Sequence, residues 1–198
     1  MKNIDISHTI FKKVSQAGAE LNMPVYAVGG YVRDQLLGRA SKDIDFVCVG
    51  SGIDLAKKTA SLISDKIKVN YFKNFGTAMF RMGDLDVEFV GARKESYQRD
   101  SRKPIVEEGT LDDDQNRRDF TINALAISLN KDSFGEIVDS FDGIKDLENG
   151  IIKTPLDPDI TFSDDPLRMM RAIRFATQLD FTIAASTLEA IERNKDRI

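Results

Sequence analysis

The sequence predicts an α/β (α+β) fold, with a small mixed sheet flanked by helices in a head and then an all-helical neck. Short apolar strands alternate with amphipathic helices as far as about residue 140. A tight Gly83-Asp84 turn joins two of these strands. Beyond residue 153, apolar residues recur only at helical spacing. We therefore expect a head over residues 1–140 and a helical neck over residues 141–198.

Each element follows from a local pattern, beginning with helical spacing over 6–21 and a break at Pro24. Gly38 is expected to cap the second helix at its C-terminus. The expected strands are 25–28, 43–49, 66–72, 77–82 and 85–90, with a hairpin of 126–129 and 136–138. The further helices expected are 31–37, 53–64, 120–126, 165–179 and 184–193, and a polar loop is expected over 91–114.

The composition excludes several kinds of site. One Cys and one His among 198 residues exclude a zinc site built from several Cys and His ligands, and also a disulfide framework. A Ser-His-Asp hydrolase would depend on His8, close to the N-terminus, which we do not expect. Carboxylates, arginines and oxygen-preferring metals such as Mg2+ therefore remain as the source of chemistry.

The charge balance also restricts the expected partners. A net charge of -4 does not favour nucleic-acid binding through the global field, although a local basic stripe remains open. No apolar run approaches the ~20 residues that span a bilayer, so no membrane partner is expected. The lone cysteine fits a reducing compartment, and we expect a cytoplasmic protein.

A pair of carboxylates is the first candidate site. Asp43 and Asp45 begin a predicted strand, where residues two apart point to the same face. Converging carboxylates repel one another unless a cation such as Mg2+ compensates them. A third acid could come from Asp86 or Glu88, which share a face of another strand, and the residues alone do not choose between them.

A candidate phosphate site lies upstream of this pair. Gly29-Gly30 separates a predicted strand from a helix, where free backbone N–H groups attract phosphate. Arg33, one turn into the helix, could bind the same phosphate through two hydrogen bonds. A Rossmann site is not indicated, because Gly-x-Gly-x-x-Gly is missing. The alternative interpretation is that Gly29-Gly30 forms only a tight turn and that Asp43 and Asp45 are only solvated acids.

Four ordered motifs closely resemble the class II tRNA nucleotidyltransferase and bacterial poly(A) polymerase family, which belongs to the polymerase-β-like nucleotidyltransferases. They are Val28-Gly29-Gly30-Tyr31-Val32-Arg33-Asp34 with Leu36-Leu37-Gly38, Lys42-Asp43-Ile44-Asp45, Arg117-Arg118-Asp119-Phe120-Thr121-Ile122-Asn123-Ala124-Leu125, and Asp164-Asp165-Pro166-Leu167-Arg168-Met169-Met170-Arg171-Ala172-Ile173-Arg174-Phe175. The resemblance extends from Val25 to Phe181 and implies a polymerase-β-like head.

The resemblance also implies roles for individual residues. Asp43 and Asp45 would be the catalytic, metal-binding carboxylates, and Glu88 is preferred to Asp86 as the third. The triphosphate would be held by Gly29, Gly30 and Arg33. The nucleotide sugar would be contacted by Arg118 and Asp119, and Arg117 is their neighbour in the motif.

The helix expected at 165–179 carries a basic stripe. At 100° per residue, Arg168, Arg171 and Arg174 fall within an arc of roughly 120°. The opposite side is expected to pack inward through Met169, Ala172, Ile173 and Ala176, and Met170 is also expected in the core. A capped surface helix with an Asp165–Arg168 pair is the alternative to a binding site.

The resemblance implies that this helix reads the base. Asp165 would accept a hydrogen bond from the exocyclic amino group of C or A, and Arg168 would donate to the adjacent ring acceptor. G and U would leave both groups unpaired. Arg171 and Arg174 would support the pair or bind phosphate. Where the family usually has Glu, this chain has Asp164; the change precedes Asp165, so base reading is expected to survive it, and the resemblance gives less support to a role for Asp164 itself.

The loop from 93 to 110 falls where the family has a flexible element that helps to switch from CTP to ATP. Its basic residues could contact RNA or triphosphate, or the loop could simply be solvated. These residues are Arg93, Lys94, Arg99, Arg102 and Lys103.

The resemblance thus implies template-independent addition of CCA to tRNA 3′ ends from CTP and ATP with Mg2+, without a role for DNA. A poly(A) polymerase, or an enzyme adding only part of CCA, shares every motif used. A nucleotide-binding module without turnover is an alternative of another class. The family has body and tail regions after the neck, so we expect this chain to be a head-and-neck fragment. We therefore expect it to bind nucleotide and metal but to have weak or no activity alone, and tRNA to be held by the full-length protein.

Overall fold

The computed structural model describes residues 4–73, 76–98 and 101–198, with backbone only for residues 96–98 and 101–105. The chain forms two compact units that alternate along the sequence. The first unit comprises residues 4–93, 108–111 and 126–138, and the second comprises residues 94–107, 112–125 and 139–198, with the gaps given above. The expected head of residues 1–140 and neck of 141–198 describe a division by function and stay a prediction.

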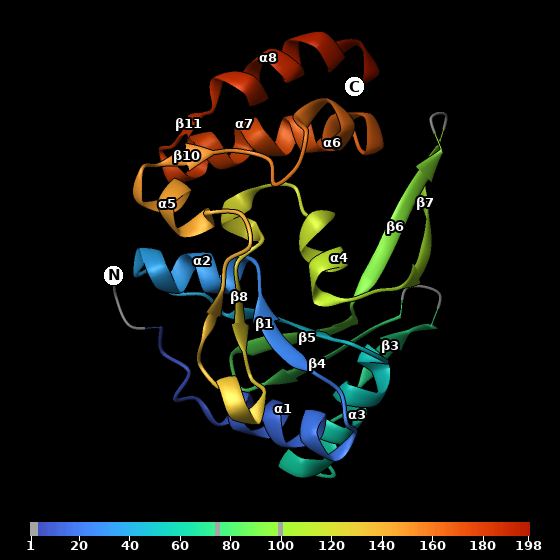
Figure 1. The fold of residues 1–198 in the computed structure, drawn as a ribbon. Coiled ribbons are helices and arrows are strands. Elements are labelled where there is room, and N and C mark those ends of the chain that lie inside the picture. Colours follow the sequence, from blue (N-terminus) through green and yellow to red (C-terminus); the bar gives the residue numbers. More distant parts are fainter. Residues whose placement is uncertain (1–3, 74–75, 99–100) are drawn as a thin grey trace. The chain divides into compact units, whose positions relative to one another are not determined.

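The first unit is built on a seven-stranded sheet with the order β3-β4-β5-β2-β1-β8-β9 (Figure 1). Its strands are β1 (Val25–Val28), β2 (Asp43–Cys48), β3 (Asn70–Phe72), β4 (Thr77–Met82), β5 (Leu85–Gly91), β8 (Ala126–Ser128) and β9 (Ile137–Val138). β2 and β5 run parallel, whereas the other neighbouring strands run antiparallel. The expected mixed sheet is therefore confirmed.

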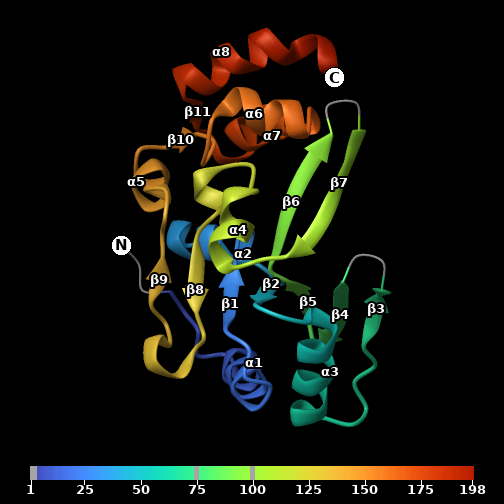
Figure 2. The ribbon, with the colours of Figure 1, turned by 45° about the vertical axis from the view of Figure 1, so that its right-hand side comes forward.

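Helices α1 (Thr9–Glu20), α2 (Gly30–Leu37) and α3 (Gly52–Ile63) complete this unit. Figure 2 shows α3 beside β4 and β5, against which it packs. The core beneath the sheet holds Phe46 and Phe89 with ring centroids 5.3 Å apart, and the Phe11 ring lies 5.8 Å from Phe46. All three side chains are fully buried. Alternation along β2 and β5 turns these rings inward and leaves the acidic residues on the other face.

The second unit is mainly helical. Its helices are α4 (Leu111–Asn116), of which only Leu111 belongs to the first unit, α5 (Gly143–Glu148), α6 (Pro158–Asp164), α7 (Leu167–Leu179) and α8 (Ala185–Asn194). The short 3-10 helices η2 (Thr121–Asn123) and η4 (Lys195–Arg197) belong to the same unit, whereas η3 (Lys131–Ser133) belongs to the first. The strands β10 (Ile151–Ile152) and β11 (Thr182–Ile183) pair in parallel. The strands β6 (Arg93–Gln98) and β7 (Ser101–Glu108) form a separate two-stranded sheet.

Four expectations about local structure are wrong. The segment 91–114 is not an irregular loop, because most of it forms β6, β7 and the start of α4. Residues 120–126 form only a single 3-10 turn before β8, and the strand expected from Lys66 begins at Asn70. On α7, Ile173 is 48% exposed and Met170 is 49% exposed, because the buried side of the helix passes through Met169, Ala172, Phe175 and Leu179.

No helix in the described part of the chain is long and apolar enough to cross a membrane.

Truncating the aromatic core should destabilise the protein. Phe46→Ala removes a fully buried ring from contact with Phe11 and Phe89, which we expect to cost about 3–5 kcal/mol. Urea denaturation followed by far-ultraviolet circular dichroism measures this loss. Phe72→Ala is the matched control, since Phe72 is 53% exposed and its truncation should change stability by less than about 0.5 kcal/mol. Equal losses from the two substitutions would contradict the assignment of the core.

Candidate nucleotide-binding and catalytic residues

The register of β2 against β5 places four acidic residues on one face of the first unit's sheet. Asp43 is paired with Asp86, and Asp45 with Glu88, across the parallel ladder. Paired residues point to the same side, opposite to the buried Ile44 and Phe46. Both expected candidates for the third carboxylate therefore lie on the same face as the Asp43–Asp45 pair, and Glu88 is the one paired with Asp45.

The electrostatics of this face favour a cation. Partial burial and then the neighbouring Asp45 raise the pKa of Glu88, and Arg93 opposes that rise. Carboxylate oxygens are the ligands that Mg2+ prefers. Within the described residues no three His, Cys, Asp or Glu side chains already form a metal-binding group. The fit of Asp43 and Asp45 to Mg2+ therefore rests on donor chemistry and on the shared face.

The glycine pair lies where β1 passes into α2. Gly29 precedes the helix with φ 72°, a conformation that suits glycine, and its side-chain-free backbone leaves the first N–H groups of α2 without a side-chain cap. The Arg33 guanidinium lies 3.7 Å from the point where a Cβ on Gly30 would stand. Arg33 is buried and pairs with Asp34 at 2.8 Å. Backbone donors and a fixed cation are thus brought together at this helix N-terminus, as phosphate binding requires.

A buried carboxylate organises the arginine motif of the second unit. Asp114 is fully buried and pairs with Arg117, and with Arg118 at 2.8 Å. Arg118 also donates a hydrogen bond to the carbonyl of Asn123 at 3.2 Å. Burial opposes ionisation of Asp114, but attraction to Arg118 and Arg117 outweighs it and lowers the pKa of the carboxyl. Asp114 therefore holds both arginines in place. The only indication of this role in the sequence is that Asp114 precedes Arg117 and Arg118 by three and four residues.

Asp119 links this motif to α7. Its carboxylate accepts hydrogen bonds from the Phe120 N–H at 2.9 Å, from the Asn123 amide at 3.1 Å and from Arg171 Nε at 2.7 Å. A second nitrogen of Arg171 lies 2.6 Å from the same carboxylate. Arg171 and Arg174 both lie over the Phe175 ring, at 5.3 and 4.8 Å from its centroid. The structure therefore brings together Asp119 and Arg171, which the sequence had placed in separate motifs.

Arg168 lines a cavity of about 210 Å³ within the second unit. Arg168 is only 9% exposed, and the cavity is also lined by Glu95, Arg117 and Asp164. Glu95 Oε1 lies 3.6 Å from Arg117 Nη1. Burial raises the pKa of Asp164, Arg168 lowers it and Glu95 raises it further, so the carboxyl titrates above its ordinary value. Three acids, two arginines and a lysine thus line one cavity, the remaining charged residues being Asp113 and Lys94.

The two aspartates before α7 have different surroundings. Asp165 accepts a hydrogen bond from the Leu167 N–H at 3.1 Å, while its backbone carbonyl accepts one from the Arg168 N–H at 3.0 Å. Among the described residues Asp164, not Asp165, lines the cavity around Arg168. Sequence reasoning therefore missed Asp164 and Glu95. The Asp164-Asp165 motif was a local indication of Asp164. Glu95 is distant in sequence from α6 and α7, and only the fold brings it into the same cavity as their residues.

Arg99 lies outside the described residues, as do the side chains of Arg102 and Lys103, so their contacts with ligand stay a prediction. His8 caps α1 by accepting a hydrogen bond from the Ile10 N–H, and burial raises the pKa of Cys48 to about 12. His8 therefore acts in capping a helix, and Cys48 is a buried thiol of the core.

Comparisons with known proteins agree on one family. A family model described as "Poly A polymerase head domain" matches residues 25–153. An A-adding tRNA nucleotidyltransferase from Aquifex aeolicus is 44% identical over 168 residues, which cover 85% of this chain and 20% of the relative.

Two solved structures are similar in both sequence and fold. A CCA-adding enzyme in its second apo form is 37% identical with a TM-score of 0.88, covering 98% of this chain and 46% of that one. A tRNA nucleotidyltransferase complexed with a primer tRNA and an incoming ATP analog is 39% identical with a TM-score of 0.80, covering 92% of this chain and 50% of that one. The chain thus spans half the length of these proteins or less.

Neutralising Asp114 should destabilise the second unit in a pH-dependent way. Asp114→Asn leaves two arginines without their buried partner, and we expect a loss of about 3–5 kcal/mol near neutral pH. Because the folded pKa lies below the ordinary value of 3.8, the stabilisation is complete above that pH and is lost as the pH falls through the folded pKa. Urea denaturation across this pH range measures the effect.

Asp112→Asn on the same helix is the control for this change, since Asp112 is exposed and should contribute little. A loss of stability from Asp114→Asn that stayed constant down to the lowest pH would contradict the ionic role of Asp114.

Proposed function

Because this chain belongs to the poly(A) polymerase head-domain family, which includes the class II tRNA nucleotidyltransferases, we propose that it supplies the nucleotidyltransferase function of a protein that adds C, C and A to tRNA 3′ ends. The observation that carries the proposal is the shared sheet face of Asp43, Asp45 and Glu88. The helix N-terminus beside Arg33 supports it as a triphosphate site. The A-adding relative favours partial addition of CCA as the second candidate.

In this reaction the 3′ hydroxyl of the RNA attacks the α-phosphorus of CTP or ATP, and the bond from that phosphorus to pyrophosphate breaks. Backbone N–H groups at Gly29 and Gly30 and the guanidinium of Arg33 hold the triphosphate. Asp43 and Asp45, with Glu88, would hold Mg2+. When bound, Mg2+ would favour loss of the hydroxyl proton and offset the charge on the departing pyrophosphate.

The second unit supplies sugar and base recognition in this proposal. Arg118 and Asp119 contact the ribose, and the buried partners of both side chains hold them in place. Asp165 accepts a hydrogen bond from the amino group of C or A, and Arg168 donates to the adjacent ring acceptor. Because G and U present a carbonyl and an N–H there, they leave Asp165 and Arg168 unpaired. Arg171 and Arg174 support this pair or bind phosphate.

The buried free thiol of Cys48 is compatible with a reducing compartment, and we propose a cytoplasmic location.

The activity is tested with a tRNA that lacks its 3′ CCA. The full-length protein should extend it with CTP and ATP, and Asp43→Ala should lower the rate by about 1,000-fold, because one of the carboxylates that would hold Mg2+ is lost. Denaturing gel electrophoresis of labelled tRNA resolves the added nucleotides. Asp84→Ala, which removes an exposed acid from the β4–β5 turn, should leave the rate unchanged. Normal activity of Asp43→Ala would refute the metal assignment, and a long A tail alone would favour a poly(A) polymerase.

Base selection is tested by binding alone. The chain should bind CTP and ATP about tenfold or more tightly than GTP and UTP, since a mismatched base leaves buried polar groups unpaired. Arg168→Ala should remove most of this preference. Isothermal titration calorimetry measures all four affinities, and Asp196→Ala, at an exposed position in η4, is the control. Equal binding of the four nucleotides by the unaltered protein would show that Asp165 and Arg168 do not read the base.

A further inference from the structure

The open end of the first unit's sheet continues the face that carries the acidic residues. The strand pairing aligns four residues in one row across the sheet, which are Asp45 on β2, Glu88 on β5, Met79 on β4 and Asn70 on β3. Side chains that are paired across strands share a face, so this row crosses the sheet from the carboxylates to its edge. Three strand spacings separate β2 from β3, which amounts to about 14 Å.

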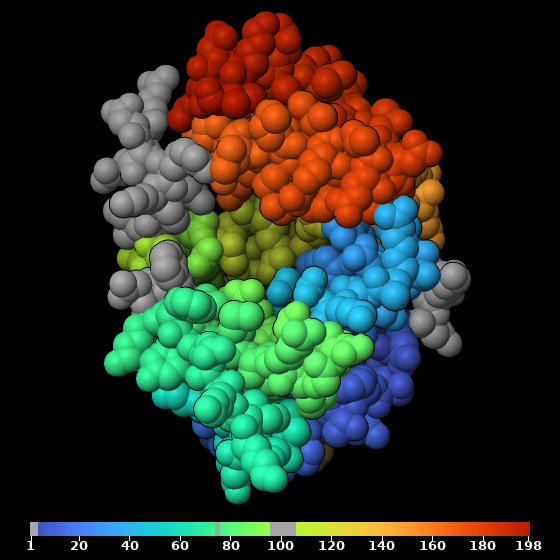
Figure 3. Space-filling model, turned by 180° about the vertical axis from the view of Figure 1, so that it is seen from behind, coloured from blue at the N-terminus to red at the C-terminus, as the bar shows by residue number. Residues whose placement is uncertain are grey.

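Two exposed side chains flank this row near the edge. Phe72 on β3 lies two residues beyond Asn70 and is 53% exposed, although it is a large aromatic residue. The side chain of Arg81 on β4 is 67% exposed and lies 3.6 Å from Asp86. We call Asn70, Phe72, Met79 and Arg81 the edge patch. In Figure 3 the teal and green atoms of β3, β4 and β5 reach the surface on this side of the first unit.

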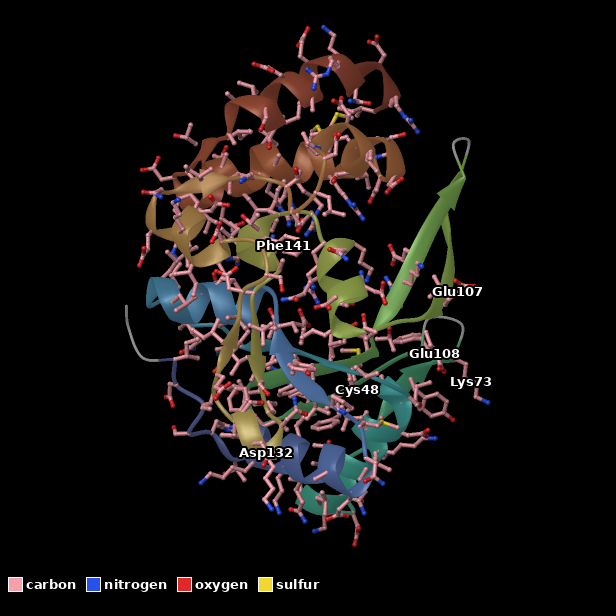
Figure 4. All side chains as sticks on the ribbon, viewed as in Figure 1. Cys48, Lys73, Glu107, Glu108, Asp132 and Phe141 are labelled. Carbon is pink, nitrogen blue, oxygen red and sulfur yellow. The ribbon has the colours of Figure 1, made fainter. Side chains whose placement is uncertain are left out.

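The segment of sequence that leads into β3 is basic, although the protein as a whole is acidic. Residues 57–73 contain five lysines and one acid, a net charge of +4, whereas the whole chain has a net charge of -4. The five lysines are Lys57, Lys58, Lys66, Lys68 and Lys73. Lys73 follows Phe72 directly and extends away from the end of β3 (Figure 4). Lys57 lies 4.9 Å from the centre of the Tyr71 ring, on the opposite face of the same strand.

An exposed aromatic ring on the face that carries the acidic residues, followed in sequence by an exposed lysine, fits one class of partner. Single-stranded nucleic acids are bound by aromatic rings that stack on bases and by cations that contact the backbone. A duplex does not offer unstacked bases to Phe72. We propose that the edge patch and Lys73 bind single-stranded RNA close to the end that approaches Asp45, with a base on Phe72 and phosphates beside Arg81 and Lys73. The choice of RNA over DNA rests on the proposed function.

Fluorescence anisotropy with a labelled, unstructured RNA 12-mer tests this inference on the 198-residue chain. The double substitution Phe72→Ala with Lys73→Ala should weaken RNA binding about tenfold, while Phe72→Trp with Lys73 intact should retain it. The matched control replaces Phe134 and Lys131, an exposed aromatic and a lysine between β8 and β9, at the other end of the strand order. This control should leave RNA binding unchanged.

Three outcomes would overturn the inference. The first is an unchanged RNA affinity in the Phe72/Lys73 variant, and the second is an equal loss of RNA affinity in the Phe134/Lys131 control. The third is that a duplex of the same sequence binds as tightly as the single strand and loses as much affinity in the Phe72/Lys73 variant. Binding to vesicles of anionic lipid that falls in the Phe72/Lys73 variant while RNA binding does not would assign the patch to a membrane instead. CTP affinity, measured in parallel, should be the same in all variants. If the unaltered chain does not bind CTP, that result would count against the proposed function, whereas the comparison of RNA affinities between variants would still hold.

Discussion

The parallel pairing of β2 with β5 is the constraint on which the first unit depends. It places Phe46 against Phe89 in the core and, on the other face, Asp45 opposite Glu88. A slip of one residue would turn every side chain of β2 over and bury the acids. The apolar contacts that stabilise the fold and the positions of the carboxylates therefore have one cause, and the core cannot shift its register without abolishing the acidic face.

In the second unit, buried carboxylates position the candidate site residues, as the strand pairing does in the first unit. Asp114 and Asp119 each fix arginines through several hydrogen bonds, so three guanidinium groups are oriented before any ligand arrives. Burying these carboxylates is expensive unless every partner remains in place. Such sites favour precise orientation of Arg118 and Arg171 over stability, which suits residues that recognise a planar base, a ribose or a phosphate.

Much of the first unit could be predicted because its signals are local. Alternation along residues 43–48 and 85–91 identifies both strands and their acidic face, and Gly29-Gly30 identifies the turn into α2. The choice between Asp86 and Glu88 rested on the family resemblance, because both acids lie on the same face as Asp43 and Asp45. The sequence of residues 93–108 is mostly polar and lacks strand-like alternation, so the pairing of β6 with β7 was not predicted. The cavity around Arg168 draws residues from segments about 70 positions apart, and no local pattern indicates that.

The alternation of the two units along the chain has a consequence for how the protein can be divided. The chain passes between the units after Arg93, Glu107, Leu111, Leu125 and Val138. A polypeptide that ended at residue 140 would keep β6, β7 and the arginine motif but lose α7, and with it the Arg171 partner of Asp119. Neither unit is a contiguous piece of sequence that recombination could transfer intact. Gene fusion or exchange within this family is therefore expected to preserve the whole stretch from β1 to α7 as one block.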